Sequence, residues 1–182
     1  CELAVPSCHN AGARQVKCIP THTLANYVGD SMASMPLVST MALPFASAAA
    51  VCQGASVREL LDLGARILDF RVGMHEGEIH VCHTVVCELT LQEALREVLS
   101  FLETNADEVV AVLIKRDWEH RDFDTDDNWV TLQAVVSSVF GDLLADDISL
   151  SVQVLKENGT RVLVLLEAPA DTDIFCGIRS SQ

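Results

Sequence analysis

The sequence has 182 residues and a net charge of −14, from 12 lysine and arginine residues against 26 aspartate and glutamate residues. This acidity, without any basic stripe, argues against a nucleic acid partner, and no apolar run reaches the ~20 residues of a membrane-spanning helix. Apolar residues make up 49% of the chain, which is enough for the core of one domain, whereas a complete eight-stranded α/β barrel typically takes about 250 residues.

The first 35 residues have no clean apolar periodicity, yet they hold three of the seven cysteines, Cys1, Cys8 and Cys18. This pattern predicts an irregular, cystine-held segment over 1–35, followed by one domain over 36–182. Disulfides and the glycosylation sequon at Asn158 indicate a secreted or surface protein. Buried, reduced cysteines and a chance sequon are the alternative.

The first predicted elements follow this segment. An apolar run at 37–43, ended by Pro44, predicts a strand. A capping box over 56–59 begins a short helix that ends near Gly64, because its first and fourth residues can satisfy the free N–H groups of the first turn. Two strands follow at 65–72 and 78–84, with a turn around Gly77.

The second half of the domain alternates helices and strands. A capping box over 90–93 begins the clearest amphipathic helix, with apolar residues at helical spacing to Leu102. Apolar runs at 109–114 and 162–166 have the character of strands buried on both faces, and helical spacing returns over 132–143. Five strands interleaved with helices predict an α/β fold built mainly from parallel strands.

Polar residues lie at the carboxyl ends of these strands, where parallel α/β folds carry their sites. The second strand ends with Asp69 and Arg71, the third with His83, the fourth with Lys115 and the fifth with Glu167. Cationic side chains beside an imidazole suit a phosphate ester, because they neutralise its oxygens while the imidazole moves a proton. The alternative is a surface ion pair with an unrelated polar histidine.

Residues 56–118 resemble the X domain of phosphatidylinositol-specific phospholipase C, in the stretches 59–71, 80–84, 90–102 and 108–115. Residues 36–167 resemble it more loosely. The resemblance implies a distorted barrel of the eight-stranded α/β (TIM) type. Five strands are fewer than the eight of such a barrel, so we expect a partial or shortened barrel without its C-terminal strands, or a protein partner or second chain that completes it.

The resemblance also implies a mechanism, in which an inositol 2-hydroxyl attacks phosphorus and releases diacylglycerol while two histidines act as general base and general acid. His83 matches the acid, Lys115 a substrate-binding lysine, and Asp69 an assisting carboxylate. Arg71 matches the arginine that stands in for Ca²⁺ in the metal-independent bacterial type, so no cofactor is expected. The second histidine belongs to a segment of type Ile-Pro-Gly-Thr-His-Asp-Ser.

Two matches to this segment remain open. Residues 43–48 follow the first predicted strand, but Ser47 then replaces the histidine and Ala48 the aspartate, and a serine cannot act as a general base near neutral pH. Residues 19–23 keep a histidine, His22, without the aspartate. We favour the first match, because 36–44 carries a strand pattern.

The sequence therefore predicts a secreted phospholipase C-like domain that has lost catalysis and has a binding or structural role. The acidic Glu167, placed where bacterial members have a basic residue, supports this view. The first alternative is an active metal-independent phosphodiesterase that uses His22 and His83 on phosphatidylinositol or a related phosphodiester. The second is a module that binds a phosphoinositide or another anionic ligand at Arg71 and Lys115.

Overall fold

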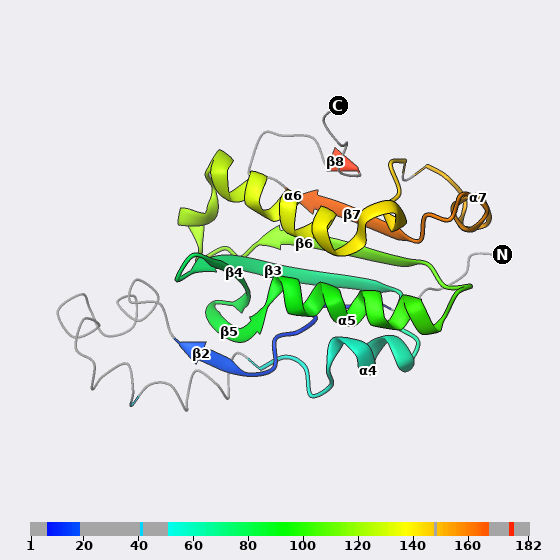
Figure 1. The fold of residues 1–182 in the computed structure, drawn as a ribbon. Coiled ribbons are helices and arrows are strands. Elements are labelled where there is room, and N and C mark those ends of the chain that lie inside the picture. Colours follow the sequence, from blue (N-terminus) through cyan, green and yellow to red (C-terminus); the bar gives the residue numbers. More distant parts are fainter. Residues whose placement is uncertain (1–6, 19–40, 42–50, 148, 168–174, 177–182) are drawn as a thin grey trace.

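The structure, a computed structural model, describes residues 7–18, 41, 51–147, 149–167 and 175–176. Eight strands of these residues form one mixed sheet, and helices α4, α5 and α6 cover one of its faces (Figure 1). The strands are β1 Ser7–Cys8, β2 Val16–Cys18, β3 Ile67–His75, β4 Glu78–His83, β5 Val85–Thr90, β6 Val110–Arg116, β7 Val162–Glu167 and β8 Phe175–Cys176. The helices are α4 Val57–Asp62, α5 Leu91–Thr104, α6 Asp126–Phe140 and α7 Val152–Asn158, with 3₁₀ turns η1 Arg121–Phe123 and η2 Gly141–Leu143.

The strand order is β2-β5-β4-β3-β6-β7-β8, and β1 also pairs with β3. Strands β1, β3, β6 and β7 are parallel, whereas β4, β5, β2 and β8 are each antiparallel to their neighbours. The sheet does not close into a ring within the described residues. The predicted α/β fold of partial barrel type is therefore confirmed, while the strand expected at 37–43 lies outside the described residues.

One predicted strand runs in the opposite direction from the one expected. The strand at 78–84 was expected to be parallel to its neighbour, but β4 is antiparallel to β3, with Val72 opposite Val81. The connection explains the difference: Glu76 and Gly77 form a tight turn with φ of 51° and 83°. A two-residue turn can join only antiparallel strands, since a parallel crossover takes about a dozen residues.

The N-terminal segment also differs from its expected form. Its described part, 7–18, contributes β1 and β2 to the main sheet rather than forming a separate irregular segment. Cys8, Cys18, Cys52, Cys82 and Cys87 are free thiols. These five cysteines therefore form no disulfide with one another, and Cys1 lies outside the described residues.

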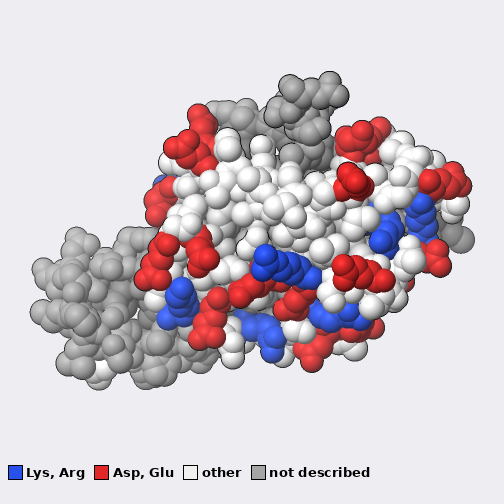
Figure 2. Space-filling model, viewed as in Figure 1, with Lys and Arg blue, Asp and Glu red and all other residues white. Residues whose placement is uncertain are grey.

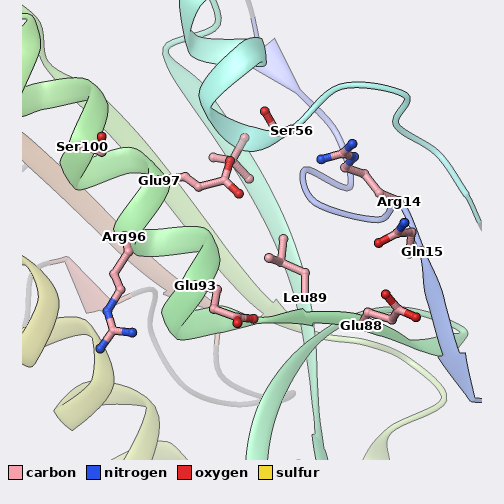
Figure 3. Close-up of a pocket in the computed structure, with 10 residues that line it drawn as sticks. Arg14, Gln15, Ser56, Glu88, Leu89, Glu93, Arg96, Glu97 and Ser100 are labelled. Carbon is pink, nitrogen blue, oxygen red and sulfur yellow. The ribbon is translucent and has the colours of Figure 1, made fainter.

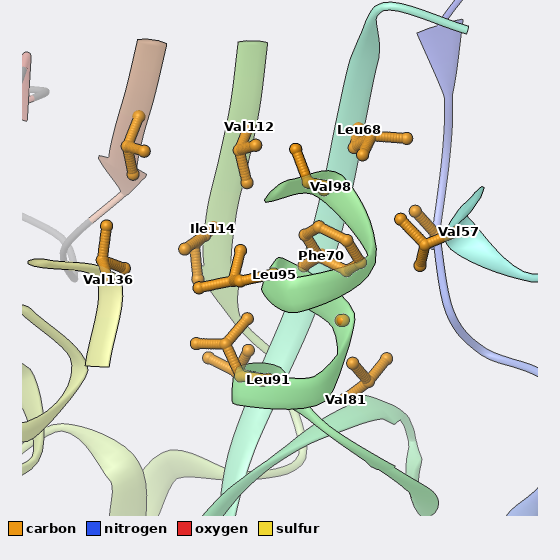
Figure 4. Packing of buried hydrophobic residues seen from close by; sticks show 14 of the residues in the cluster. Val57, Leu68, Phe70, Val81, Leu91, Leu95, Val98, Val112, Ile114 and Val136 are labelled. Carbon is orange, nitrogen blue, oxygen red and sulfur yellow. The ribbon is translucent and has the colours of Figure 1, made fainter. Parts of the chain in front are cut away.

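The helices begin where the capping residues predict. Ser56 with Glu59 and Thr90 with Glu93 both form complete capping boxes. Helix α5 lays an apolar face over the sheet, and α6 begins earlier than expected because the Thr125 hydroxyl caps its first turn. The core lies between this helical layer and the sheet (Figure 4). Its members include Val57, Leu68, Phe70, Val81, Leu91, Leu95, Val98, Val112, Ile114 and Val136.

The helical face of the molecule carries charge unevenly (Figure 2). Acidic and basic side chains lie over α4 and α5 and around the outline of this face, whereas the area over α6 is uncharged because 128–140 contains no ionisable side chain. No helix among the described residues is both long and apolar enough to cross a membrane. Because side chains alternate along a strand, burying Leu68 and Phe70 beneath the helices leaves Asp69 and Arg71 on the opposite face of the sheet.

Candidate active site

Two strands approach each other along one edge of β3: β4 ends with a histidine, and a histidine directly follows β1. Strand β1 runs parallel to β3 and ends with Cys8 opposite Leu68, so His9 is the next residue toward Asp69. Strand β4 runs the other way and ends at His83, which continuation of its register places beside Phe70. The two histidine-bearing turns therefore meet opposite the 69–71 segment of β3.

The His9 side chain is bound to the carboxylate that the sequence places in the site. His9 Nδ1 lies 2.8 Å from Asp69 Oδ2, and the backbone N–H of Ala11 donates to the Asp69 carbonyl at 2.8 Å, which fixes the turn against β3. Arg71 Nε donates to the other carboxylate oxygen, Oδ1, at 3.2 Å. Asp69 therefore holds the His9 imidazole and the Arg71 guanidinium next to each other, and 15% of the Asp69 side chain is exposed to solvent.

Further charges lie in register with Arg71. Arg71 is opposite Lys115 on β6, and Lys115 is opposite Glu167 on β7, so the three form a row across neighbouring strands. Lys115 Nζ and Glu167 form an ion pair. The row has a net charge of +1, and its two cations could neutralise the oxygens of a phosphodiester.

His83 is connected to the His9 turn through Cys52. The Cys52 Sγ lies 3.1 Å from His83 Nδ1, and the Asn10 amide donates to the same sulfur at 3.6 Å. Gln53 donates to the His9 carbonyl at 2.8 Å. Segment 52–53 therefore contacts both histidine-bearing turns.

The residue after each histidine has a left-handed backbone conformation, with φ of 51° at Asn10 and 66° at Thr84. Asparagine tolerates this region, but for a β-branched threonine it is strained. The buried carboxylate of Asp117 supports the Thr84 turn, accepting the Thr84 N–H at 3.0 Å and the Glu119 N–H at 3.1 Å. Strain maintained by a buried charged group is a recurring feature of functional sites.

The structure thus brings together Asp69, Arg71, Lys115 and Glu167 along adjacent strands, and it connects His83 to them through Cys52 and Asn10. His22, Ser47 and Ala48 lie outside the described residues. Asn158, the predicted glycosylation site, is exposed at the end of α7, ahead of the left-handed Gly159. Its modification stays a prediction.

His9 is absent from the residues that we expected at the site, although the sequence contains a signal for it. The run over 5–11 keeps Pro6 and His9 at the spacing of the segment Ile-Pro-Gly-Thr-His-Asp-Ser, whereas its other five residues differ and Asn10 replaces the aspartate. Periodicity cannot single out this run, because a two-residue strand has no period. The contact with Asp69 reveals the match.

Another concave region lies away from these residues, between the N-terminal segment, α4, α5 and β5 (Figure 3). It has a volume of about 570 Å³, but two of its carboxylates already bind the first turns of helices. Glu93 accepts the Thr90 N–H of its capping box, and Glu97 accepts the Arg58 N–H. The described residues contain no group of three histidine, cysteine or acidic side chains placed to hold a metal ion.

Comparison with known proteins gives a consistent family assignment. A family profile described as PI-PLC X 1 matches residues 35–179. The chain is 35% identical over 98 residues to PI-PLC X domain-containing protein 1 from Homo sapiens, which covers 52% of this chain and 29% of that protein. It is 32% identical over 106 residues to variant-surface-glycoprotein phospholipase C from Trypanosoma brucei brucei, covering 54% of this chain and 29% of that protein.

Solved structures support the fold. The phosphatidylinositol-specific phospholipase C from Listeria monocytogenes matches 91% of this chain with a TM-score of 0.57 at 19% identity, and the match covers 51% of that chain. A single-residue mutant of the Staphylococcus aureus enzyme matches 71% of this chain and 46% of its own, with a TM-score of 0.53 at 13% identity. The matches therefore span about half of these structures and less than a third of the curated relatives. The profile match begins after His9, so the place of His9 rests on the strand pairing and on its contact with Asp69.

Proposed function

Because this chain belongs to the X-domain family of phosphatidylinositol-specific phospholipase C, we propose that it cleaves phosphatidylinositol or a related phosphodiester with His9 and His83 as the acid–base pair. The observation that supports the proposal is the meeting of β1 and β4 on β3, which brings both histidine-bearing turns to the 69–71 segment, where His9 contacts Asp69. No metal is needed for this scheme, because Arg71 provides positive charge beside Asp69.

His9 acts as the general base in this proposal. It removes the proton of the inositol 2-hydroxyl as that oxygen forms its bond to phosphorus. The Asp69 carboxylate accepts a hydrogen bond from Nδ1 of His9. This bond orients the imidazole and stabilises the imidazolium that forms. His9 is assigned as the base because of its contact with Asp69, since a carboxylate partner stabilises an imidazole that has accepted a proton.

His83 acts as the general acid. It donates a proton to the leaving oxygen of diacylglycerol as the second bond to phosphorus breaks, so the products are a cyclic inositol phosphate and diacylglycerol. Arg71 and Lys115 neutralise the phosphate oxygens in the transition state. Glu167 reduces the effective charge of Lys115 through their ion pair, as Asp69 does for Arg71, so both cations are needed to neutralise the phosphate.

The expected loss of catalysis depended on a missing second histidine at Ser47. His9 supplies an imidazole without either Ser47 or His22, and this supports the active alternative over the inactive one. A domain that binds an anionic phosphodiester at Arg71 and Lys115 without cleaving it is the competing outcome. The secreted or surface location and a partner that completes the barrel stay predictions.

The test measures release of cyclic inositol phosphate from phosphatidylinositol vesicles, with the wild-type protein and with His9→Ala and His83→Ala. We expect activity in the wild-type protein and a loss of about a hundredfold or more in each variant, the range for a general acid or base. His75→Ala is the matched control, because His75 lies at the far end of β3. Its activity should stay close to that of the wild-type protein.

Two results would contradict the proposal. A folded wild-type protein that binds the vesicles without releasing product would support the binding module. Activity that survives His9→Ala but is lost in His22→Ala would instead identify His22 as the second histidine.

A further inference from the structure

The contact between Cys52 and His83 has no role in the reaction as described so far. The 3.1 Å separation between Sγ and Nδ1 is short for a hydrogen bond to sulfur. The sulfur also receives the Asn10 amide. It therefore has a polar neighbour from each of the two histidine-bearing turns.

Packing does not explain this contact. Cys52 is exposed, whereas Cys8, Cys82 and Cys87 are buried in the manner usual for a free cysteine. The Cys52 backbone is held independently of its side chain, because its N–H donates to the Ala13 carbonyl at 2.9 Å. The thiol thus adds little buried apolar area, and what it adds is a hydrogen-bond partner for an imidazole.

The sulfur lies 3.1 Å from Nδ1 and 3.8 Å from Nε2 of His83, so it rests against the imidazole and restricts rotation of the ring. An imidazole whose rotation is restricted presents its nitrogens in defined directions, as it does when a carboxylate partner holds a catalytic histidine. Asp69 has this role toward His9. We propose that Cys52 has the corresponding role toward His83, as a positioning residue whose sulfur, held by Asn10, orients the imidazole for proton transfer to the leaving group. The proposal rests on the proposed function.

The chain offers a matched control. Cys18 Sγ lies 3.7 Å from His75 Nε2, which makes a second cysteine–histidine contact at the other end of β3. Because this pair is remote from the 69–71 segment, changing it tests whether loss of any such contact affects the reaction. The variants are therefore Cys52→Ala, Cys52→Ser and Cys18→Ala.

We expect Cys52→Ala to lower kcat about tenfold or more, the usual effect of removing a hydrogen-bond partner from a functional histidine, with KM changed by less than about twofold. Cys52→Ser should recover most of kcat, because its hydroxyl occupies the same position and can hydrogen-bond Nδ1. Cys18→Ala should behave as the wild-type protein. A merely structural role would instead lower thermal stability, and the serine would give no rescue.

A second readout tests the contact without measuring activity. The rate at which iodoacetamide alkylates Cys52, followed by peptide mass spectrometry, should fall in His83→Asn and stay unchanged in His75→Asn, because an imidazole neighbour assists removal of the thiol proton. Equal rates of Cys52 alkylation in the two variants would show that His83 does not contact Cys52. Unchanged kcat in Cys52→Ala, with an active wild-type protein, would overturn the positioning role alone. An inactive wild-type protein would refute the proposed function and the positioning role with it.

Discussion

The two histidine-bearing turns are held in opposite ways. The His9 turn follows a two-residue strand, and its imidazole, with 68% of the side chain exposed, is hydrogen-bonded to Asp69. The His83 turn closes a hairpin of β4 and β5 and is supported by the buried carboxylate of Asp117. One histidine is therefore held by a partly exposed polar contact, and the turn of the other rests on a buried carboxylate.

This difference implies a separation of function from stability. Partly exposed polar contacts contribute little to the free energy of unfolding, so the side chain that holds the His9 imidazole can change without loss of the fold. A buried polar group that loses its partner is costly, so removal of the Asp117 carboxylate should lower stability and activity together. The following experiments test this contrast.

The largest expected effect comes from Asp69→Asn. Because the amide can no longer stabilise the His9 imidazolium, we expect kcat for cyclic phosphate release to fall about a hundredfold or more. The midpoint of urea unfolding should stay close to that of the wild-type protein. Asp62→Asn, which removes an exposed ion pair with Arg58 on α4, is the control for charge alone. If Asp69→Asn unfolds at a clearly lower urea concentration than the wild-type protein, the contacts of His9 also support the fold, and the contrast with the His83 turn is wrong.

Asp117→Ala should act mainly on the fold. It leaves the backbone N–H groups of Thr84 and Glu119 without their acceptor, at a cost of about 2–4 kcal/mol in the free energy of unfolding. Activity should fall as well, because the His83 turn loses its support. Asp117→Asn keeps one acceptor oxygen and should lie between the alanine variant and the wild-type protein in urea unfolding. If the two variants are equally stable, the carboxylate does not hold this turn.

Gly73→Ala tests the packing behind the same hairpin. A Cβ at Gly73 would lie 2.5 Å from the buried His120 ring and 3.0 Å from Cys82 Sγ, so we expect a loss of about 1–3 kcal/mol. Gly54 has no atom within 4 Å of such a Cβ, and Gly54→Ala is the control. Adding His120→Ala to Gly73→Ala should cost less than the sum of the two changes. Strict additivity would show that the two residues do not press on each other.

The same contrast explains how much the sequence could predict. Capping boxes and helical periodicity are local signals, so α4 and α5 could be placed from the residues they contain. Asp69 and Arg71 lie in the part of β3 that pairs in parallel with β6, although β3 continues to His75 beyond its expected end, and parallel register aligns Arg71 with Lys115 near the end of β6. These residues were predicted because the patterns that carry them are continuous in the chain.

His9 and Cys52 could not be found in this way. Strand β1 is defined by a partner about 60 residues away, as Ser7 pairs with Ile67, and two residues carry no period. Cys52 lies outside every helix and strand, so only the folded chain shows that it reaches His83. The antiparallel direction of β4 could have been predicted from the sequence, because a turn at Glu76 and Gly77 is too short for a parallel crossover.

The smallest expected effect concerns pH and a histidine of the hairpin itself. His80 is buried on β4 with Nδ1 2.9 Å from the Cys87 carbonyl, and burial lowers the pKa of its imidazole below the ordinary 6.5. Between this lowered pKa and 6.5 the unfolded chain binds more protons than the folded one, so stability falls as the pH drops through that window. In His80→Gln this contribution is absent, and the difference in unfolding free energy between pH 7.5 and pH 5.5 should be smaller than in the wild-type protein. An equal difference in both proteins would mean that His80 takes up a proton in the fold without cost, and that its burial does not make the hairpin sensitive to acid.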